Sequence, residues 1–238
     1  MLDLHSHILP GLDDGPQTEA ESITMIKCMD KLGFKHIVAS PHYIQGLYEN
    51  SSDIVSSAVK NIWSRFEENN ISTQIISANE VFIDSVFNDS GEMADFHVCG
   101  RKCPFILLEA PFNSFMIETL YNIIFELTNK QVKVILVHPE RSMELVRHFH
   151  LFEELVARDV KLQVNLMSLI GAYGNHSRMV AEKLLEENMV FGIGSDIHTV
   201  KQAAHDIPKA LIRINELIGE VRLSLMMKNA KEELGVCL

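Results

Sequence analysis

The sequence contains little cysteine and no long uninterrupted hydrophobic run. The four cysteines (Cys28, Cys99, Cys103 and Cys237) are too few and too scattered for a disulfide scaffold, so we expect reduced thiols. No apolar run approaches the roughly 20 residues of a membrane span. The first residues also lack the basic region and long apolar stretch of a signal peptide. These features predict a soluble, cytoplasmic protein.

Excess positive charge is also missing. The chain carries 32 Asp and Glu residues against 21 Lys and Arg residues, a formal net charge of −11, which disfavours nonspecific binding to nucleic acid or anionic lipid. A composition of 47% hydrophobic and 22% charged residues excludes disorder, collagen and coiled coil. No linker or internal repeat divides the 238 residues, so we expect one domain over residues 1–238.

Short apolar runs alternate with amphipathic stretches along the chain. The runs predict seven strands: Leu2–His7, His36–His42, Thr73–Val81, Phe105–Ala110, Val132–Pro139, Val160–Asn165 and Val190–Asp196. The stretches predict helices: Thr18–Leu32, Ser52–Asn69, Ile117–Lys130, Ser142–Arg158, Asn175–Asn188 and Ala203–Gly219. This alternation is typical of an α/β fold with parallel strands buried on both faces. A closed or nearly closed barrel is favoured, and a doubly wound sheet is the alternative.

Six of the seven predicted strands end, or nearly end, in residues able to bind metal. These residues are His5, His7, His42, Glu80, Glu109, His138 and Asp196. The sixth strand ends at Asn165 and is the exception. In a βα barrel the carboxyl ends of the strands meet on one face. We therefore expect residues from distant parts of the chain to form one cluster.

The motif His-x-His occurs twice, in different settings. His5 and His7 lie on a predicted strand, where residues i and i+2 point to the same face and can approach one ion. His148 and His150 lie in a predicted helix, where residues i and i+2 do not share a face. We predict a metal-binding role for the first pair only and surface or packing roles for the second.

Further acidic and histidine residues join the predicted cluster. Asp13 and Asp14 follow the first pair in a turn, and Asp14, just before Gly15, is the better candidate. The same turn also leads into a helix that Thr18 and Glu21 would cap. Asp196 and His198 repeat the i, i+2 spacing on the last strand. Buried carboxylates such as Glu80 and Glu109 need partners, and a multinuclear metal site would supply them.

The order of these motifs resembles the polymerase-and-histidinol-phosphatase (PHP) superfamily. The segments are His5-x-His7, Asp14-Gly15, Ser40-Pro41-His42, Glu80, Glu109, His138-Pro139-Glu140-Arg141 and Ser195-Asp196-x-His198. The opening LDLHSHILPGLDDGPQT and HPER segments resemble the manganese-dependent bacterial tyrosine-protein phosphatases of capsule and exopolysaccharide operons. The resemblance implies a distorted (β/α)7 barrel that binds three ions. It assigns His5, His7, Glu80 and Asp196 to one ion, Glu80, Glu109 and His138 to a second, and Asp14, His42 and His198 to a third.

The resemblance also implies the catalytic residues. We expect Arg141 to bind the nonbridging oxygens of a phosphate while hydroxide activated by metal attacks phosphorus, and we count His42 and His198 as catalytic too. The family usually carries a second arginine after Asp-x-His, which this chain lacks, so Lys201 or His205 is the candidate substitute. Nitrogen and oxygen ligands without thiolate suit Mn²⁺, with Fe or Zn as alternatives, and we expect two to three ions.

Three functions remain open from the sequence. The leading one is hydrolysis of phosphotyrosine in a protein, which the resemblance implies is a bacterial tyrosine autokinase. The alternatives are hydrolysis of a small ester such as histidinol phosphate and a metal-stabilised binding module without turnover. A cysteinyl-phosphate mechanism is excluded because no cysteine is followed by arginine in the spacing Cys-x5-Arg. Tyr43, Tyr48 and Phe82 are predicted either to rim the site or to pack in loops.

Overall fold

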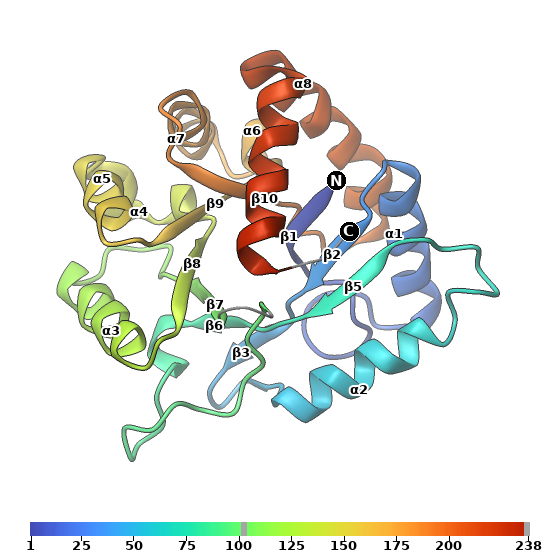
Figure 1. Ribbon diagram of the computed structural model, residues 1–238, viewed down its shortest axis with the longest axis horizontal. Coiled ribbons are helices and arrows are strands. Elements are labelled where there is room, and N and C mark those ends of the chain that lie inside the picture. The colour runs from blue at the N-terminus through green and yellow to red at the C-terminus, as the bar shows by residue number, and fades with distance from the viewer. Residues whose placement is uncertain (101–103, 236–238) are drawn as a thin grey trace.

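The computed structural model describes residues 1–100 and 104–235 (Figure 1). Its strands are β1 (Leu2–Ser6), β2 (His36–Ala39), β3 (His42–Ile44), β4 (Tyr48–Glu49), β5 (Gln74–Ser77), β6 (Glu80–Phe82), β7 (Phe105–Glu109), β8 (Lys133–Val137), β9 (Lys161–Asn165) and β10 (Val190–Gly194). Its α-helices are α1 (Glu19–Lys31), α2 (Ser52–Trp63), α3 (Ile117–Asn129), α4 (Met143–Arg147), α5 (His150–Ala157), α6 (Leu166–Leu169), α7 (Asn175–Glu186) and α8 (Ile207–Leu234). Short 3-10 turns η1 (Ile83–Ser85) and η2 (Pro139–Arg141) and a π-helical turn η3 (Gln202–Asp206) complete the elements.

The strands form two sheets. One has the order β1-β2-β5, and the other has the order β10-β9-β8-β7-β6-β3-β4. All described pairings are parallel except the β3–β4 hairpin. Figure 1 shows the strands arranged around the centre of the molecule with helices outside them. The prediction of a parallel α/β fold is confirmed.

Two of the predicted strands are interrupted and take part in both sheets. The run His36–His42 divides at Ser40-Pro41 into β2 and β3, and the run Thr73–Val81 divides into β5 and β6. Pro41 has no N–H to continue a ladder. As a result β2 pairs with β5 in the first sheet, while β3 pairs with β6 in the second. The other five runs each contain one described strand.

The last strand returns to the first without a continuous ladder among the described residues. The N–H of Asp196 donates to the carbonyl of His5 at 2.9 Å, and the N–H of His7 donates to the carbonyl of Ile197 at 3.1 Å. A side-chain contact joins the same segments, because Asp3 accepts from the Ser195 hydroxyl and from the Ser195 N–H at 2.8 Å. The ends of β1 and β10 therefore lie side by side.

The predicted helices form, with three changes. Thr18 and Glu21 make the predicted capping box at the start of α1. The stretch Ser142–Arg158 forms two helices, because the backbone leaves helical geometry at His148. The stretch Ser52–Asn69 is helical only to Trp63. The final helix continues beyond Gly219, where φ is 74°, because buried residues near its C-terminus pack against the strands.

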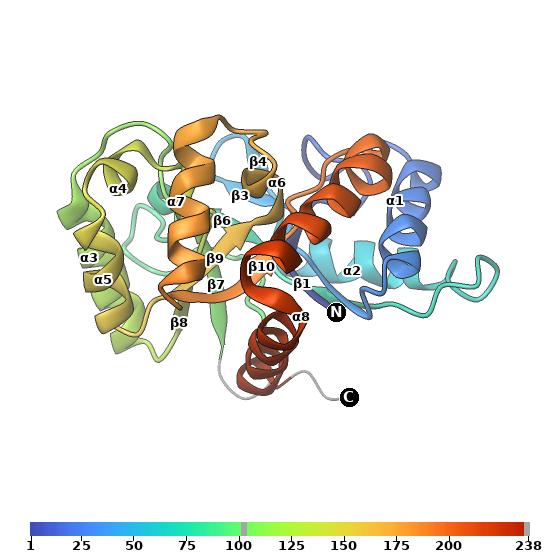
Figure 2. The same cartoon turned by 90° about the horizontal axis from the view of Figure 1, so that it is seen from above.

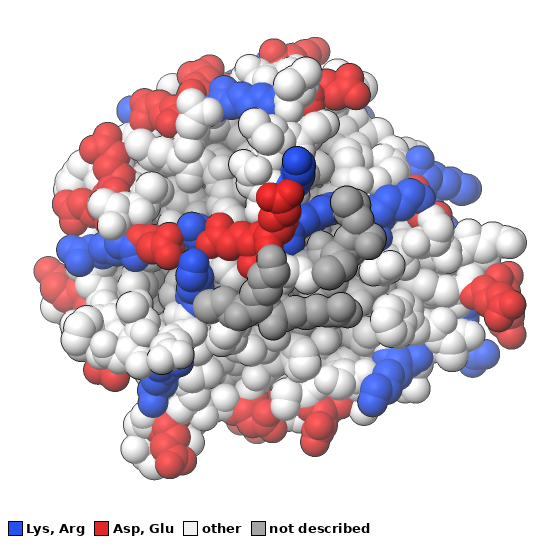
Figure 3. Space-filling model, viewed as in Figure 1, with Lys and Arg blue, Asp and Glu red and all other residues white. Residues whose placement is uncertain are grey.

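The amino and carboxyl ends of the strands differ in character. At the amino ends, Leu2, Phe105 and Leu234 belong to an apolar cluster that α8 covers. Figure 2 shows both chain termini on this side and β4 and α6 on the opposite side. On the face seen in Figure 3, acidic and basic side chains are interspersed and form no single basic patch. Among the described residues no helix is long and apolar enough to cross a membrane.

The described cysteines are free thiols. Cys28 is partly exposed, and Cys99 is buried, which raises its pKa to about 12. Cys103 and Cys237 lie outside the described residues. Neither Cys28 nor Cys99 forms a disulfide with another described residue.

Candidate metal centre

The predicted ligand residues meet where the strands end. Their side chains form four groups in which ligand atoms lie within 4.8 Å of one another. The groups are His7, Asp14, His42 and His198; His5, Glu80 and His138; His5, His7 and Asp196; and His42, Glu80 and Glu109. All nine residues predicted as ligands belong to these groups, which share members and form one cluster.

His5 and His7 converge as strand geometry predicts. Their Nε2 atoms lie 3.0 Å apart, and each lies 3.2 Å from Oε2 of Glu80. Both side chains are buried. Oδ1 of Asp196 lies 3.8 Å from Nε2 of His5 and 3.4 Å from Nε2 of His7. These four residues are the set that the family resemblance assigns to one ion.

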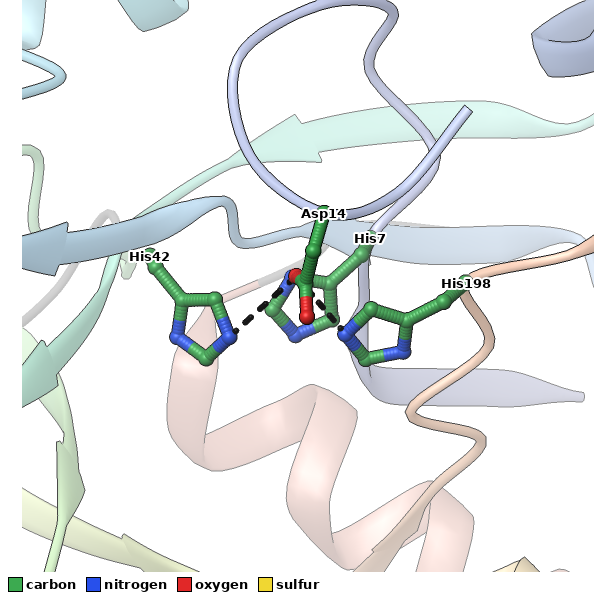
Figure 4. A group of neighbouring side chains, drawn as sticks. All are labelled: His7, Asp14, His42 and His198. Atoms are coloured by element: carbon green, nitrogen blue, oxygen red, sulfur yellow. Dashed lines mark ion pairs between the residues drawn. The ribbon is translucent and has the colours of Figure 1, made fainter. Parts of the chain in front are cut away.

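A second group lies at the more exposed side of the cluster. Figure 4 shows Asp14 between His42 and His198, with His7 beside them. Oδ1 of Asp14 lies 3.6 Å from Nε2 of His42 and 3.3 Å from Nε2 of His198. The His7 and His198 rings stack with centroids 4.0 Å apart. The choice of Asp14 over Asp13 for this group agrees with the geometry.

Glu80 lies at the centre of the cluster. Its Oε1 lies 2.7 Å from Nε2 of His138, and its Oε2 lies 2.9 Å from Nδ1 of His42. Glu109 lies farther out, 4.0 Å from each of these histidines. His42 and Glu80 are neighbours because they are register partners where β3 meets β6. The passage of the chain from one sheet to the other therefore places Glu80 between His42 and His138.

Two members of the cluster have strained backbones. The φ angles of His138 and Asp196 are 33° and 51°, in the left-handed region that non-glycine residues rarely adopt. His138 also precedes Pro139, which normally favours an extended conformation. Such strain costs about 1–3 kcal/mol per residue and persists where the surrounding structure enforces it. Here it turns both side chains toward the cluster.

The carboxyl groups of the cluster have unusual pKa values. Burial alone would raise the pKa of Glu80, but His5 and His42 outweigh it and hold that pKa well below its usual range. Burial and the neighbouring Glu80 carboxylate raise the pKa of Glu109 to about 8. Glu80 and Glu109 lie close together, and the raised pKa of Glu109 reflects its burial and the repulsion between the two carboxylates. A cation bound beside them would reduce both penalties.

The hydrogen bonding of the histidines also fits a metal. Nδ1 of His7 donates to Oδ2 of Asp13 at 2.7 Å, and Nδ1 of His5 donates to Oε1 of Gln163 at 3.1 Å. These partners orient both rings so that their Nε2 atoms face each other and Oε2 of Glu80. Nδ1 of His42 lies 2.9 Å from the same carboxylate oxygen. Histidine nitrogens and carboxylate oxygens that converge in this way form a set of ligand atoms suited to a cation.

Several supporting residues were missed by the sequence reasoning. Asp13 was considered only as a rival of Asp14, yet it holds His7 and also accepts the N–H of His42 at 3.1 Å. Nothing in the sequence marked Gln163 except its position on the sixth predicted strand, two residues before Asn165. That strand was the exception without a ligand, and its Asn165 Nδ2 donates to Oδ2 of Asp196 at 2.6 Å. These residues hold the side chains of the cluster through hydrogen bonds.

Arg141, the predicted phosphate-binding residue, lies beside the cluster. Its Nη1 donates to Oδ2 of Asp196 at 2.9 Å. Lys201 and His205 are exposed on the segment that follows His198, and no contact among the described residues joins either side chain to the cluster. Their role in phosphate binding stays a prediction.

The predicted aromatic rim is present only in part. Tyr48 stacks on the ring of His42 with centroids 5.9 Å apart, whereas Tyr43 packs against Phe96. Phe82 packs against the main core. Phe112 was not predicted, and it lies 5.7 Å from the His138 ring. Aromatic side chains therefore flank the cluster on the sides of His42 and His138.

The chain matches known proteins over almost its whole length. The family described as "Capsular polysaccharide synthesis, CpsB/CapC" matches residues 1–235. Tyrosine-protein phosphatase YwqE of Bacillus subtilis is 28% identical over 234 residues, which cover 97% of this chain and 90% of that protein. Putative tyrosine-protein phosphatase CapC of Staphylococcus aureus is 26% identical over 200 residues, covering 84% of this chain and 78% of that protein.

Solved structures give the same result. The chain superposes with a TM-score of 0.85 and 26% identity on a structure from work on YwqE from Bacillus subtilis and CpsB from Streptococcus pneumoniae, unique metal-dependent tyrosine phosphatases. The superposition covers 99% of this chain and 94% of the other. The chain therefore has the fold of this structure.

Proposed function

This chain belongs to the CpsB/CapC family of capsular polysaccharide synthesis, and from that premise we propose that it is a metal-dependent protein-tyrosine phosphatase. The observation that carries the proposal is the convergence of nine histidine and carboxylate side chains beside Arg141. Similarity to YwqE, CapC and CpsB, which are tyrosine-protein phosphatases by name, supports the same activity.

The cluster has enough ligands for two to three Mn²⁺ ions, with Fe or Zn as alternatives. His5, His7, Glu80 and Asp196 would hold the first ion, and Glu80, Glu109 and His138 the second. Asp14, His42 and His198 would hold a third. Bound ions would supply Lewis acidity and lower the pKa of water toward neutrality. The overlap among the four groups of side chains supports shared ligands such as Glu80.

The remaining chemistry falls to side chains of this protein. Arg141 would bind the nonbridging oxygens of the phosphate, because a guanidinium offers paired N–H donors that match such oxygens. His42 and His198 lie on the more exposed side of the cluster, where a substrate can reach them. We count these three residues as the catalytic group, and Lys201 or His205 as the candidate for a second phosphate contact.

An aryl phosphate suits this site better than an alkyl phosphate. Tyrosine leaves as a phenolate whose conjugate acid has a pKa of about 10, whereas an alkoxide is far more basic. A strongly basic leaving group needs a well-placed general acid, and His205 is the one residue with a claim to that role. The substrate would be a phosphotyrosine-bearing protein, and we extend the proposal to a bacterial tyrosine autokinase that controls capsule or exopolysaccharide synthesis.

The same proposal covers the organisation of the chain. Residues 1–238 would form one phosphatase domain, with the seven strand runs as a distorted (β/α)7 barrel of the PHP type. The two backbone hydrogen bonds between the ends of β1 and β10 support this arrangement.

One set of measurements on purified protein tests the function. Metal analysis should find two to three transition-metal ions per chain, and a chelator should abolish hydrolysis of p-nitrophenyl phosphate. With manganese present, kcat/KM should be much higher for phosphotyrosyl peptides than for histidinol phosphate. Full activity of metal-free protein would contradict the metal centre. A preference for histidinol phosphate would favour the small-ester alternative and make His205→Ala the next variant.

A further inference from the structure

The guanidinium of Arg141 lies over two aromatic rings. Its central carbon is 4.2 Å from the ring centroid of Phe112 and 4.0 Å from that of Tyr173. The three residues come from separate segments, since Phe112 follows β7, Arg141 ends η2 and Tyr173 follows α6. A guanidinium that close to two ring faces is held by cation–π attraction to each. The two rings therefore restrict the movement of the Arg141 head group.

Hydrogen bonds fix the same guanidinium within its plane. Nη1 of Arg141 donates to Oδ2 of Asp196 at 2.9 Å, and the hydroxyl of Tyr173 donates to the same oxygen at 3.2 Å. This is the one side-chain hydrogen bond of Arg141 among the described residues. A guanidinium has five N–H donors. Its position is set while most of its donors stay available to a ligand.

The position of these two rings connects them with the candidate site. Asp196 belongs to the metal cluster, and the Phe112 ring lies beside His138, another member. The ring of Phe112 is 43% exposed, so it stands at the mouth of the cluster rather than in the core. A flexible arginine loses side-chain entropy when it binds phosphate, and a side chain already fixed loses less. The rings thus prepare Arg141 for an anion next to the metal ions.

We propose that Phe112 and Tyr173 are positioning residues that hold Arg141 in the orientation that binds the phosphate group of the substrate. This inference rests on the proposed phosphatase function, which gives Arg141 its ligand. Neither ring takes part in the chemistry, and each acts through the guanidinium.

The test is the affinity of the manganese-loaded protein for inorganic phosphate, measured by calorimetry. Phe112→Leu and Tyr173→Leu should each weaken binding about 5- to 20-fold with unchanged metal content, because one ring face is lost. Tyr173→Phe keeps the ring and should lose less than Tyr173→Leu. Tyr121→Leu is the matched control, because Tyr121 also stacks on an arginine (Arg158, 4.5 Å) and donates to a glutamate (Glu154, 2.7 Å).

Repeating the measurement in Arg141→Lys protein shows whether the two rings act through Arg141. In Arg141→Lys protein, adding Phe112→Leu should weaken phosphate binding less than about 2-fold. Lysine has no planar group on which the ring of Phe112 can stack. An equal loss in both backgrounds, or no loss in either, would overturn the proposal.

The two proposals can fail separately. If phosphate binding depends on Phe112 but phosphotyrosyl peptides are not hydrolysed, the phosphatase function is wrong and the positioning role holds. If the peptides are hydrolysed while Phe112→Leu binds phosphate normally, only the positioning role is wrong. Wild-type protein that binds no phosphate would contradict both.

Discussion

Two segments with the same His-x-His motif have opposite structural roles in this chain. His5 and His7 are buried, with Nε2 atoms 3.0 Å apart and facing Glu80. His148 and His150 are exposed, with ring centroids 6.0 Å apart, and belong to none of the ligand groups found among the described residues. The motif alone does not distinguish them.

The backbone and the neighbouring residues make the difference. His5 lies on β1, where alternate residues share a face, whereas His148 lies in the break between α4 and α5 and His150 begins α5. The prediction that one helix contains both His148 and His150 is therefore wrong, because the backbone is not helical at His148. The carboxylate beside each pair also differs. Asp13 is buried and holds His7 at 2.7 Å, while Glu144 lies 3.6 Å from His148 near solvent. The His-x-His pair that joins the cluster therefore has both a shared face and a buried carboxylate beside it, and the exposed pair has neither.

The largest expected effect concerns the histidines themselves. His5→Ala or His7→Ala should lower kcat/KM on p-nitrophenyl phosphate at least about 1,000-fold, because each removes a side chain from the centre of the cluster. His148→Ala and His150→Ala should change it less than about 2-fold. The assay uses excess Mn²⁺, with metal content measured for every variant. Similar losses in both pairs would show that backbone conformation and burial do not distinguish the two His-x-His motifs.

The next effect concerns the carboxylate beside each pair. Asp13→Asn should weaken Mn²⁺ affinity about 10- to 100-fold, since partners that orient metal-binding histidines typically contribute this much. Glu144→Gln is the control, because Glu144 lies beside a histidine outside the cluster. Titration against a competing chelator measures both affinities. Equal affinities for Asp13→Asn and wild type would remove the orienting partner from the explanation.

A smaller effect is the pH dependence that the buried site gives to the metal-free protein. The pKa of Glu109 in the folded chain, about 8, lies above its ordinary value of 4.5. Between these values the folded chain holds a proton that the unfolded chain has released. The free energy of unfolding should therefore fall as pH rises, by up to about 1.4 kcal/mol per pH unit from this group.

Glu109→Gln isolates this contribution from those of other groups. Urea unfolding in the presence of a chelator, between pH 5 and 8, should give a steeper decline for wild type than for the variant. Parallel pH profiles would show that Glu109 has an ordinary pKa. The exposed histidine segment contains no comparable buried carboxyl group among its described contacts.

Much of the fold and the convergence of the candidate ligand residues could be predicted from the sequence. Each of the seven apolar runs contains a described strand, and the residues at their ends, such as Glu80 and His138, meet as expected. Strand-end positions are informative because parallel strands of an α/β fold point their carboxyl ends the same way. A ligand-type residue at the end of an apolar run is therefore visible without knowledge of the strand order.

Other features depend on contacts that no local pattern reveals. The break between β2 and β3 follows from pairing with two different sheets, and α8 resumes after Gly219 because Leu223 and Met227 pack into the core. Gln163 and Phe112 act through neighbours that are distant in sequence. The left-handed backbone at His138 is likewise enforced by the folded surroundings.

The smallest expected effect concerns the stability contributed by the exposed pair. His148 is 51% exposed and faces Glu144 across 3.6 Å, an i, i+4 spacing on the surface. Exposed pairs of this kind contribute about 0.3–0.5 kcal/mol, since solvent screens the charges and two flexible side chains must be ordered. His148→Ala should therefore change the free energy of unfolding by at most about 0.5 kcal/mol in urea titrations at pH 6, 7 and 8. A loss above about 1 kcal/mol would mean that His148 makes a buried contact, and burial would then no longer separate the two motifs.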